Sequence, residues 1–126
     1  MSLVLDASAL LAYLQNEVGA DSVATGLEGA LVSAVNWSEV LQKAMRAGVD
    51  TDGMARDFMA LGVQFRPFTS EQAEIAAQLW NRTRQRGLSL ADRACLALAI
   101  ETASPVLTAD RIWTELNLEL DIHVVR

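Results

Sequence analysis

The chain has 126 residues, of which 52% are hydrophobic, and a net charge of −6 from 16 acidic and 10 basic side chains. This length predicts one domain, residues 1–126. The sequence argues against a membrane-spanning protein, since no apolar run approaches the roughly 18 residues that a spanning helix needs. The acidic balance argues against a general nucleic-acid binder, whose affinity comes from lysine and arginine. With no cationic leader at the start, we expect a cytoplasmic protein with no membrane partner.

The predicted elements alternate between strands and helices along the whole chain. In chain order they are a strand at 3–5, helices over 10–14 and 18–27, a strand at 30–35, helices over 37–48 and 52–61, a strand at 63–65, helices over 69–87 and 89–101, a strand at 106–107, a short helix at 112–116 and a strand at 122–125. This alternation predicts an α/β fold with a central, mostly parallel sheet of about five strands flanked by helices.

The single cysteine and the single histidine carry little chemistry. Cys95 lies in an apolar segment and is expected to be a small buried hydrophobe. His123 is too isolated to indicate a histidine-based metal site or a catalytic triad.

Asp6 is the strongest single indication of function in the sequence. It directly follows the apolar run Leu3-Val4-Leu5, which has the character of a strand buried on both faces. Ligands of open α/β sheets bind at the carboxyl ends of the strands, where Asp6 is expected to lie. Ser8 is a candidate N-cap for the following helix, an interpretation that leaves Asp6 without a capping role.

Three further acids stand at a strand-to-helix passage or in the first turn of a helix: Glu39, Asp92 and Asp110. Asn36 to Glu39 and Ser89 to Asp92 each fit a capping box, and Asp110 fits an N-cap. Taken singly, capping explains each of these acids without any chemistry.

Taken together, the acids indicate a cation site. If the strands that precede Asp6 and Asp110 are neighbours, their terminal carboxylates converge, and the helix starts bearing Glu39 and Asp92 can close over the same crevice. Two charges 4 Å apart repel by about 4 kcal/mol at an effective dielectric of 20, so such a cluster needs a cation. Ligands that are all oxygen favour Mg²⁺ or Mn²⁺, and such ions support phosphodiester hydrolysis.

The segments around these acids resemble the PIN-domain ribonucleases, most closely the VapC-type toxins of bacterial toxin–antitoxin pairs. The resemblance covers essentially the whole chain, in order. It is carried by LVLDASAL with Asp6 and Ser8, NWSEV with Glu39, LADRACLALA with Asp92, and VLTAD with Thr108 and Asp110.

The resemblance implies a PIN-like fold and a metal-dependent endoribonuclease that cleaves RNA with metal-activated water. Asp6, Glu39, Asp92 and Asp110 are then the catalytic acids around Mg²⁺ or Mn²⁺, with Ser8 and Thr108 in supporting roles. Family members usually form homodimers and are inhibited by a cognate antitoxin protein.

Four arginines are candidate RNA contacts: Arg82, Arg84, Arg86 and Arg93. The alternative for the first three is that cations at a helix C-terminus favour the helix dipole and face solvent. For Arg93, the alternative is a local ion pair with Asp92.

Two other functions stay open at this point: a non-catalytic PIN-fold binding module and an α/β phosphoacceptor signalling domain. A phosphoacceptor domain needs an acidic pair near the start and a lysine late in the chain. Here Ala7 follows Asp6, and the only lysine is Lys43.

Overall fold

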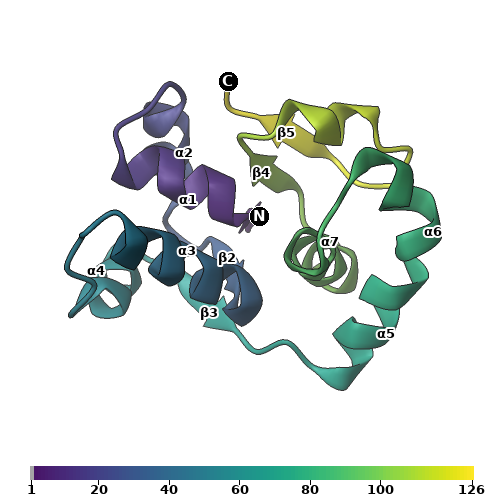
Figure 1. The fold of residues 1–126 in the computed structure, drawn as a ribbon, viewed down its shortest axis with the longest axis horizontal. Helices are drawn as coiled ribbons and strands as arrows, with labels where there is room; N and C mark the ends of the chain where they lie inside the picture. The colour runs from purple at the N-terminus through teal and green to yellow at the C-terminus, as the bar shows by residue number, and fades with distance from the viewer. Residues whose placement is uncertain (1) are drawn as a thin grey trace.

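The structure, a computed structural model, describes residues 2–126 and has a five-stranded sheet at its centre (Figure 1). The strand order is β3-β2-β1-β4-β5, and every neighbouring pair is parallel. The predicted α/β fold is therefore confirmed. The strands are β1 (Val4–Leu5), β2 (Leu31–Ser33), β3 (Gln64–Arg66), β4 (Val106–Thr108) and β5 (Ile122–Val124).

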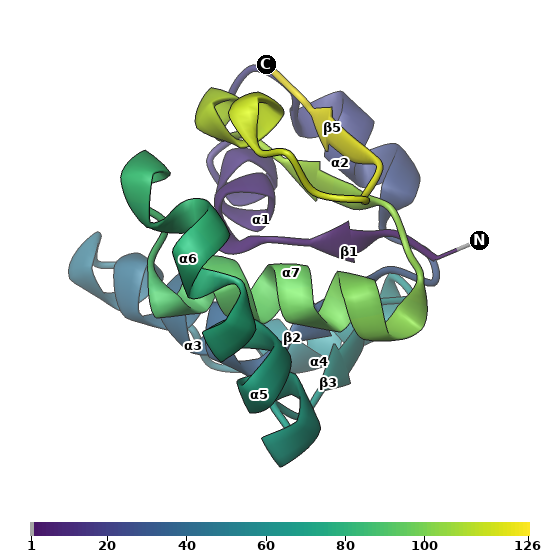
Figure 2. The same ribbon diagram turned by 90° about the vertical axis from the view of Figure 1, so that its right-hand side faces the viewer.

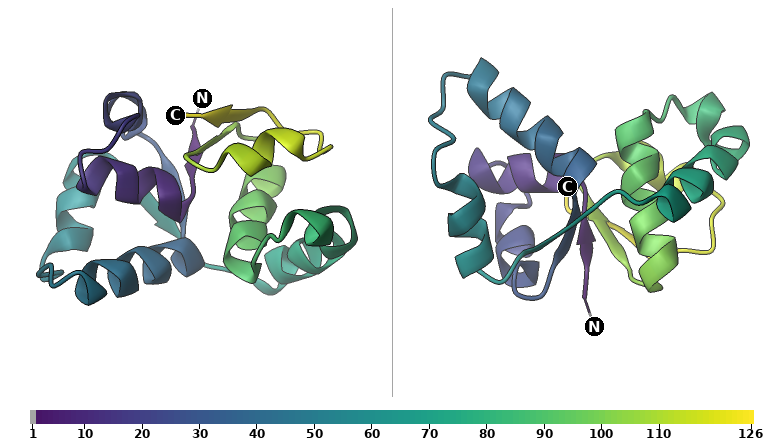
Figure 3. Two further views of the ribbon diagram at one scale, coloured as in Figure 1. Left: turned by 45° about the horizontal axis from the view of Figure 1, so that its top comes forward. Right: turned by 90° about the horizontal axis from the view of Figure 1, so that it is seen from below.

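Helices cover both faces of the sheet, with α1 to α4 on one side and α5 to α7 on the other (Figure 3). Figure 2 shows α7 across the sheet, with α5 and α6 outside it. The helices are α1 (Ala7–Leu14), α2 (Ala20–Gly26), α3 (Ala34–Arg46), α4 (Met54–Ala60), α5 (Ser70–Gln78), α6 (Trp80–Thr83) and α7 (Leu90–Thr102), with 3₁₀ helices η1 (Arg84–Arg86) and η2 (Arg111–Glu115). None of the helices in the described part of the chain combines the length and apolar character that crossing a membrane requires.

Each inner strand contributes to two hydrophobic cores, one on each face of the sheet. In β1, Leu5 packs into the core under α1 to α4, whereas Val4 packs into the core under α7, and both are fully buried. Successive side chains of a strand point to opposite faces, so a strand covered on both sides must be apolar throughout. Cys95 is fully buried in the second core, as predicted.

The predicted helix over 69–87 is wrong in one respect, because the chain bends within it. The structure divides this segment into α5, α6 and η1. The buried Thr83 hydroxyl donates to the Leu79 carbonyl at 2.9 Å. Threonine bonds of this kind back to the preceding turn often bend a helix.

The sheet order determines where the site lies. Because β1 lies between β2 and β4 and is parallel to both, the segments that leave these three strands start at one edge of the sheet. Asp6 leaves β1 at this edge, and α3 follows β2 there without a loop.

The turn before β3 offers a test of the packing that holds β2 beside β3. Gly62 has φ +101°, and a Cβ added there would lie 2.7 Å from the Glu28 Cα. Gly48 also has positive φ, at +79°, but an added Cβ meets nothing within 4 Å. Both alanine variants share the strain of positive φ, so the difference between them isolates the clash of the new Cβ with Glu28. We expect Gly62→Ala to lower the free energy of unfolding by about 1–3 kcal/mol more than Gly48→Ala does. Urea denaturation measures the difference, and equal losses would contradict the contact.

Candidate functional site

The Asp6 carboxylate lies at the end of β1 and is only 3% exposed. Its Oδ1 accepts from the Ala9 backbone N–H at 2.9 Å, and its Oδ2 accepts from the Thr108 hydroxyl at 2.6 Å. Asp6 is therefore the N-cap of α1, and the prediction that Ser8 caps this helix is wrong. In the usual N-cap geometry, the cap residue has an extended backbone, and its short side chain accepts from the backbone N–H of the residue three positions later.

The Ser8 hydroxyl instead joins Asp6 to the end of β4. It lies 2.8 Å from each Asp6 carboxylate oxygen and donates its proton toward them. The Ser8 hydroxyl oxygen also accepts from the Ala109 backbone N–H at 2.9 Å. Thr108 Oγ1 in turn accepts from the Asp110 N–H at 3.1 Å. Two hydroxyls thus fix the carboxylate between the ends of β1 and β4.

Burial raises the pKa of Asp6 to about 6 from an ordinary value of 3.8. The hydrogen bonds from Thr108, Ala9 and Ser8 oppose this shift, while the negative charge of Asp92 adds to it. Three donors therefore do not fully offset the cost of removing this carboxylate from water. A nearby cation would favour its ionised form.

Asp92 occupies the first turn of α7 in a capping box. The Ser89 N–H donates to Asp92 Oδ2 at 3.0 Å, and the Asp92 N–H donates to the Ser89 hydroxyl at 3.1 Å. Capping is therefore confirmed for this acid. Burial raises the pKa of Asp92 most strongly, the bonds from Ser89 lower it, and the charges of Glu39 and Asp110 raise it. These charge effects indicate that the acids share one edge of the sheet.

Glu39 is held differently from the capping box that the sequence predicts. Helix α3 begins at Ala34 with Ser33 as its N-cap, so Glu39 lies beyond the first turn and the capping interpretation is wrong. The Glu39 carboxylate pairs with the Lys43 ammonium at 3.2 Å, one turn further along the helix. Because both side chains are partly exposed, this ion pair contributes little to stability and leaves the carboxylate accessible.

Asp110 is the N-cap of η2, as the sequence predicts. Its Oδ1 accepts from the Ile112 N–H at 3.0 Å. The remainder of its carboxylate faces solvent at the end of β4.

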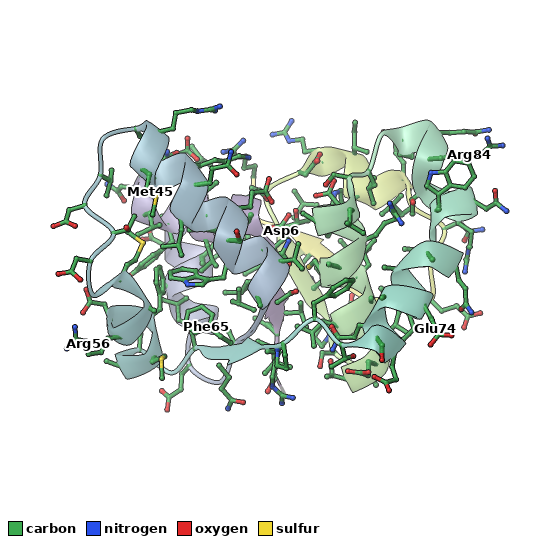
Figure 4. All side chains as sticks on the ribbon, turned by 60° about the horizontal axis from the view of Figure 1, so that its bottom comes forward. Asp6, Met45, Arg56, Phe65, Glu74 and Arg84 are labelled. Atoms are coloured by element: carbon green, nitrogen blue, oxygen red, sulfur yellow. The ribbon has the colours of Figure 1, made fainter. Side chains whose placement is uncertain are left out.

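The four acids come from segments that meet around the same edge of the sheet. Figure 4 shows Asp6 between the start of α3 and the start of α7. Within residues 2–126, no three carboxylate, imidazole or thiol groups lie close enough together to enclose a metal ion. The donor set nevertheless suits a hard divalent cation, since it is all oxygen, and the pKa values of Asp6 and Asp92 are raised by burial and by the charges of other acids in the set.

The four predicted RNA contacts all have partners of their own. The Arg93 guanidinium donates to the Ala76 carbonyl at 2.9 Å, and within residues 2–126 it forms no ion pair with Asp92. Arg84 lies at the outer end of the molecule in Figure 4, away from Asp6. An RNA contact by these arginines stays a prediction. The other partners are the Asn117 carbonyl for Arg82, the Trp80 ring at 5.1 Å for Arg84, and Glu115 at 3.3 Å for Arg86.

Asn36 is a positioning residue that the sequence interpretation missed. Its side chain is 1% exposed, and its Nδ2 donates to the Ala91 carbonyl at 2.9 Å, next to Asp92. Its Oδ1 has no hydrogen-bond partner among the described residues. The bond joins the start of α3 to the start of α7. The sequence spacing of Asn36 could have indicated its burial, because it lies on one helix face with Val40 and Ala44, the two other buried residues of α3.

Comparisons with known proteins identify the family and the fold. The family model described as "PIN domain" matches residues 3–117. The fold is similar to DNA-bound VapBC from Salmonella typhimurium, with a TM-score of 0.76, 12% identity and coverage of 100% of this chain and 99% of that one. It is also similar to VapC20 from Mycobacterium tuberculosis, a sarcin-ricin loop cleaving toxin, with a TM-score of 0.72, 15% identity and coverage of 94% and 98%. VapBC2 from Rickettsia felis, bound to a promoter DNA fragment, gives a TM-score of 0.72 at 12% identity, with 98% of each chain covered. No curated protein matches the sequence significantly.

The buried Asp6 carboxylate makes the stability of the metal-free protein depend on pH. The folded-state pKa of about 6 lies above the ordinary 3.8, so the folded state binds more protons and Asp6 costs stability as pH rises through 6. We compare the free energy of unfolding of Asp6→Asn with that of the wild type at two pH values. The difference, variant minus wild type, should be about 1 kcal/mol larger at pH 8 than at pH 5. Urea denaturation in EDTA measures both values.

Asp110→Asn is the matched control, because it removes an exposed carboxylate from the same edge. A wild type and an Asp6→Asn variant whose stabilities change in parallel between these pH values would contradict the buried, raised-pKa assignment.

Proposed function

Since the chain belongs to the PIN domain family, we propose that it is a metal-dependent endoribonuclease acting as the toxin of a type II toxin–antitoxin system. The observation that carries the proposal is the buried Asp6 carboxylate at the end of the central strand, whose pKa the charge of Asp92 raises further. We further propose that residues 1–126 are a single PIN-like domain, which the two cores on one sheet support.

In this proposal Asp6, Glu39, Asp92 and Asp110 are the catalytic acids and hold Mg²⁺ or Mn²⁺. When bound, the ion supplies a water activated for attack on the phosphodiester and stabilises charge on the leaving oxygen. Ser8 and Thr108 keep Asp6 in one orientation, since each donates to its carboxylate. Ser89 does the same for Asp92 through the N–H that holds its Oδ2.

The proposed partners are an RNA substrate, a second copy of the chain and a cognate antitoxin protein. A toxin–antitoxin complex from Klebsiella pneumoniae and two DNA-bound VapBC structures have a similar fold, which supports an antitoxin for this chain. VapC20 is described as a sarcin-ricin loop cleaving toxin, which supports RNA as the substrate class. RNA and antitoxin are available in the cytoplasm, where we propose that the protein acts.

The nuclease proposal predicts RNA cleavage that depends on a divalent ion and on Asp6. We expect purified protein to cleave RNA internally with Mg²⁺ or Mn²⁺, and EDTA to abolish cleavage. Asp6→Asn should lower the rate by about a hundredfold or more, because several kcal/mol of charge stabilisation disappear with the carboxylate. Gel analysis of an end-labelled RNA measures the rate.

We call the edge of the sheet that carries Asp6, Glu39, Asp92 and Asp110 the acidic edge. Asp50→Asn is the control for this experiment, since it makes the same chemical change at an exposed position outside the acidic edge. Equal cleavage by the wild type and Asp6→Asn would show that contaminating nuclease, or other residues, cut the RNA. No cleavage by the wild type with either ion would favour a non-catalytic binding module.

Metal binding should also be visible in stability, without any RNA. A ligand that binds only the folded state adds about 2.7 kcal/mol at a hundredfold excess over its Kd. We expect Mg²⁺ or Mn²⁺ to raise the melting temperature of the wild type and of Asp50→Asn, and to have little effect on Asp92→Asn. Melting curves with and without millimolar ion test this, and an unchanged wild type would count against a site formed by these acids.

A further inference from the structure

A solvent-open recess adjoins the acidic edge and is lined by Ser8, Ala109, Asp110, Arg111 and Arg126. Ser8 and Ala109 also surround the buried carboxylate, because the Ser8 hydroxyl contacts both Asp6 oxygens and accepts from the Ala109 N–H. The recess therefore adjoins the proposed cleavage site, because Ser8 and Asp110 belong to both. A strand of RNA that reaches Asp6 passes beside it.

The two arginines add positive charge to a recess that also contains Asp110 of the acidic edge. Both are exposed, and both also line a second recess beyond it, together with Glu17 and its neighbours. In a chain with a net charge of −6, a pair of guanidinium groups beside clustered carboxylates is a local exception. Guanidinium groups bind phosphate through two parallel hydrogen bonds.

The arginines differ in how far they are already engaged. Within residues 2–126, no carboxylate lies within ion-pairing distance of Arg111. The Arg126 guanidinium pairs with Glu17 at 2.9 Å, and the two side chains are each 41% exposed. An exposed pair of this kind is weak, so a phosphate can take the place of Glu17.

We propose that Arg111 and Arg126 form a phosphate-binding subsite that holds the RNA backbone next to the carboxylate site. This inference rests on the proposed nuclease function and adds to it the side from which the strand is held. The proposal commits to RNA and not to an acidic protein segment, because a strand cut at Asp6 also lies along Ser8, which lines the recess.

The test measures affinity for a labelled single-stranded RNA, with cleavage blocked by Asp6→Asn. Adding Arg111→Gln or Arg126→Gln should each weaken binding by about tenfold, the loss expected for one charge-assisted contact. Each should also reduce the slope of log affinity against log salt by about 0.7. Arg56→Gln is the matched control, because this exposed arginine lies at the far end of the molecule from Asp6 (Figure 4).

Glu17→Gln provides a change of opposite sign. It removes the carboxylate that competes for Arg126, so RNA should bind more tightly than to the parent. If Glu17→Gln and Arg126→Gln lower the melting temperature alike and leave RNA affinity unchanged, the pair is a structural link and the subsite is refuted. That result would favour an acidic protein segment as the partner of Arg111.

The cleavage assay separates this inference from the function on which it rests. If the otherwise wild-type chain cleaves RNA, and the arginine variants bind and cleave as well as Arg56→Gln, only the subsite is wrong. If neither the wild type nor any variant cleaves or binds RNA, the nuclease proposal fails and the subsite fails with it.

Discussion

The arrangement of the candidate site depends on one carboxylate buried at the end of the central strand. Asp6 follows β1, which pairs with β2 on one side and β4 on the other, so groups from distant parts of the chain meet around it. Ala9, Ser8 and Thr108 all donate to it, yet its pKa stays raised. The fold thus accepts an unfavourable ionised group at the position where a parallel sheet offers a ligand site.

Capping and metal binding do not compete for these acids. Asp92 uses Oδ2 for its bond to Ser89, and Asp110 uses Oδ1 for its bond to Ile112. Neither bond engages the second carboxylate oxygen. A cap also fixes the orientation of a short side chain without another residue, and rigid placement is what a preorganised ligand needs. The helix starts at this edge therefore act as supports for the candidate site.

The sheet and the positions of the acids were predictable because they depend on local pattern. Strands covered on both faces must be continuously apolar, and Asp6 and Asp110 stand out by following such runs directly. Which of Asp6 and Ser8 caps helix α1 was not predictable, since aspartate and serine are equally suitable N-cap residues. It is decided by Ala109, a hundred residues away, whose N–H donates to the Ser8 hydroxyl. The role of Asn36 also depends on a distant partner, the Ala91 carbonyl.

The net negative charge constrains how such a protein can bind RNA at all. Phosphate neutralisation normally supplies most of the affinity, but Arg82 and Arg93 already donate to backbone carbonyls of the chain itself. If the chain is the proposed nuclease, cations beside the acidic edge, including a divalent ion, supply most of the attraction, and they act only where the strand reaches the site. Weak attraction elsewhere on the surface then reduces binding to arbitrary RNA. For the proposed nuclease, this distribution of charge favours few RNA targets over general RNA cleavage.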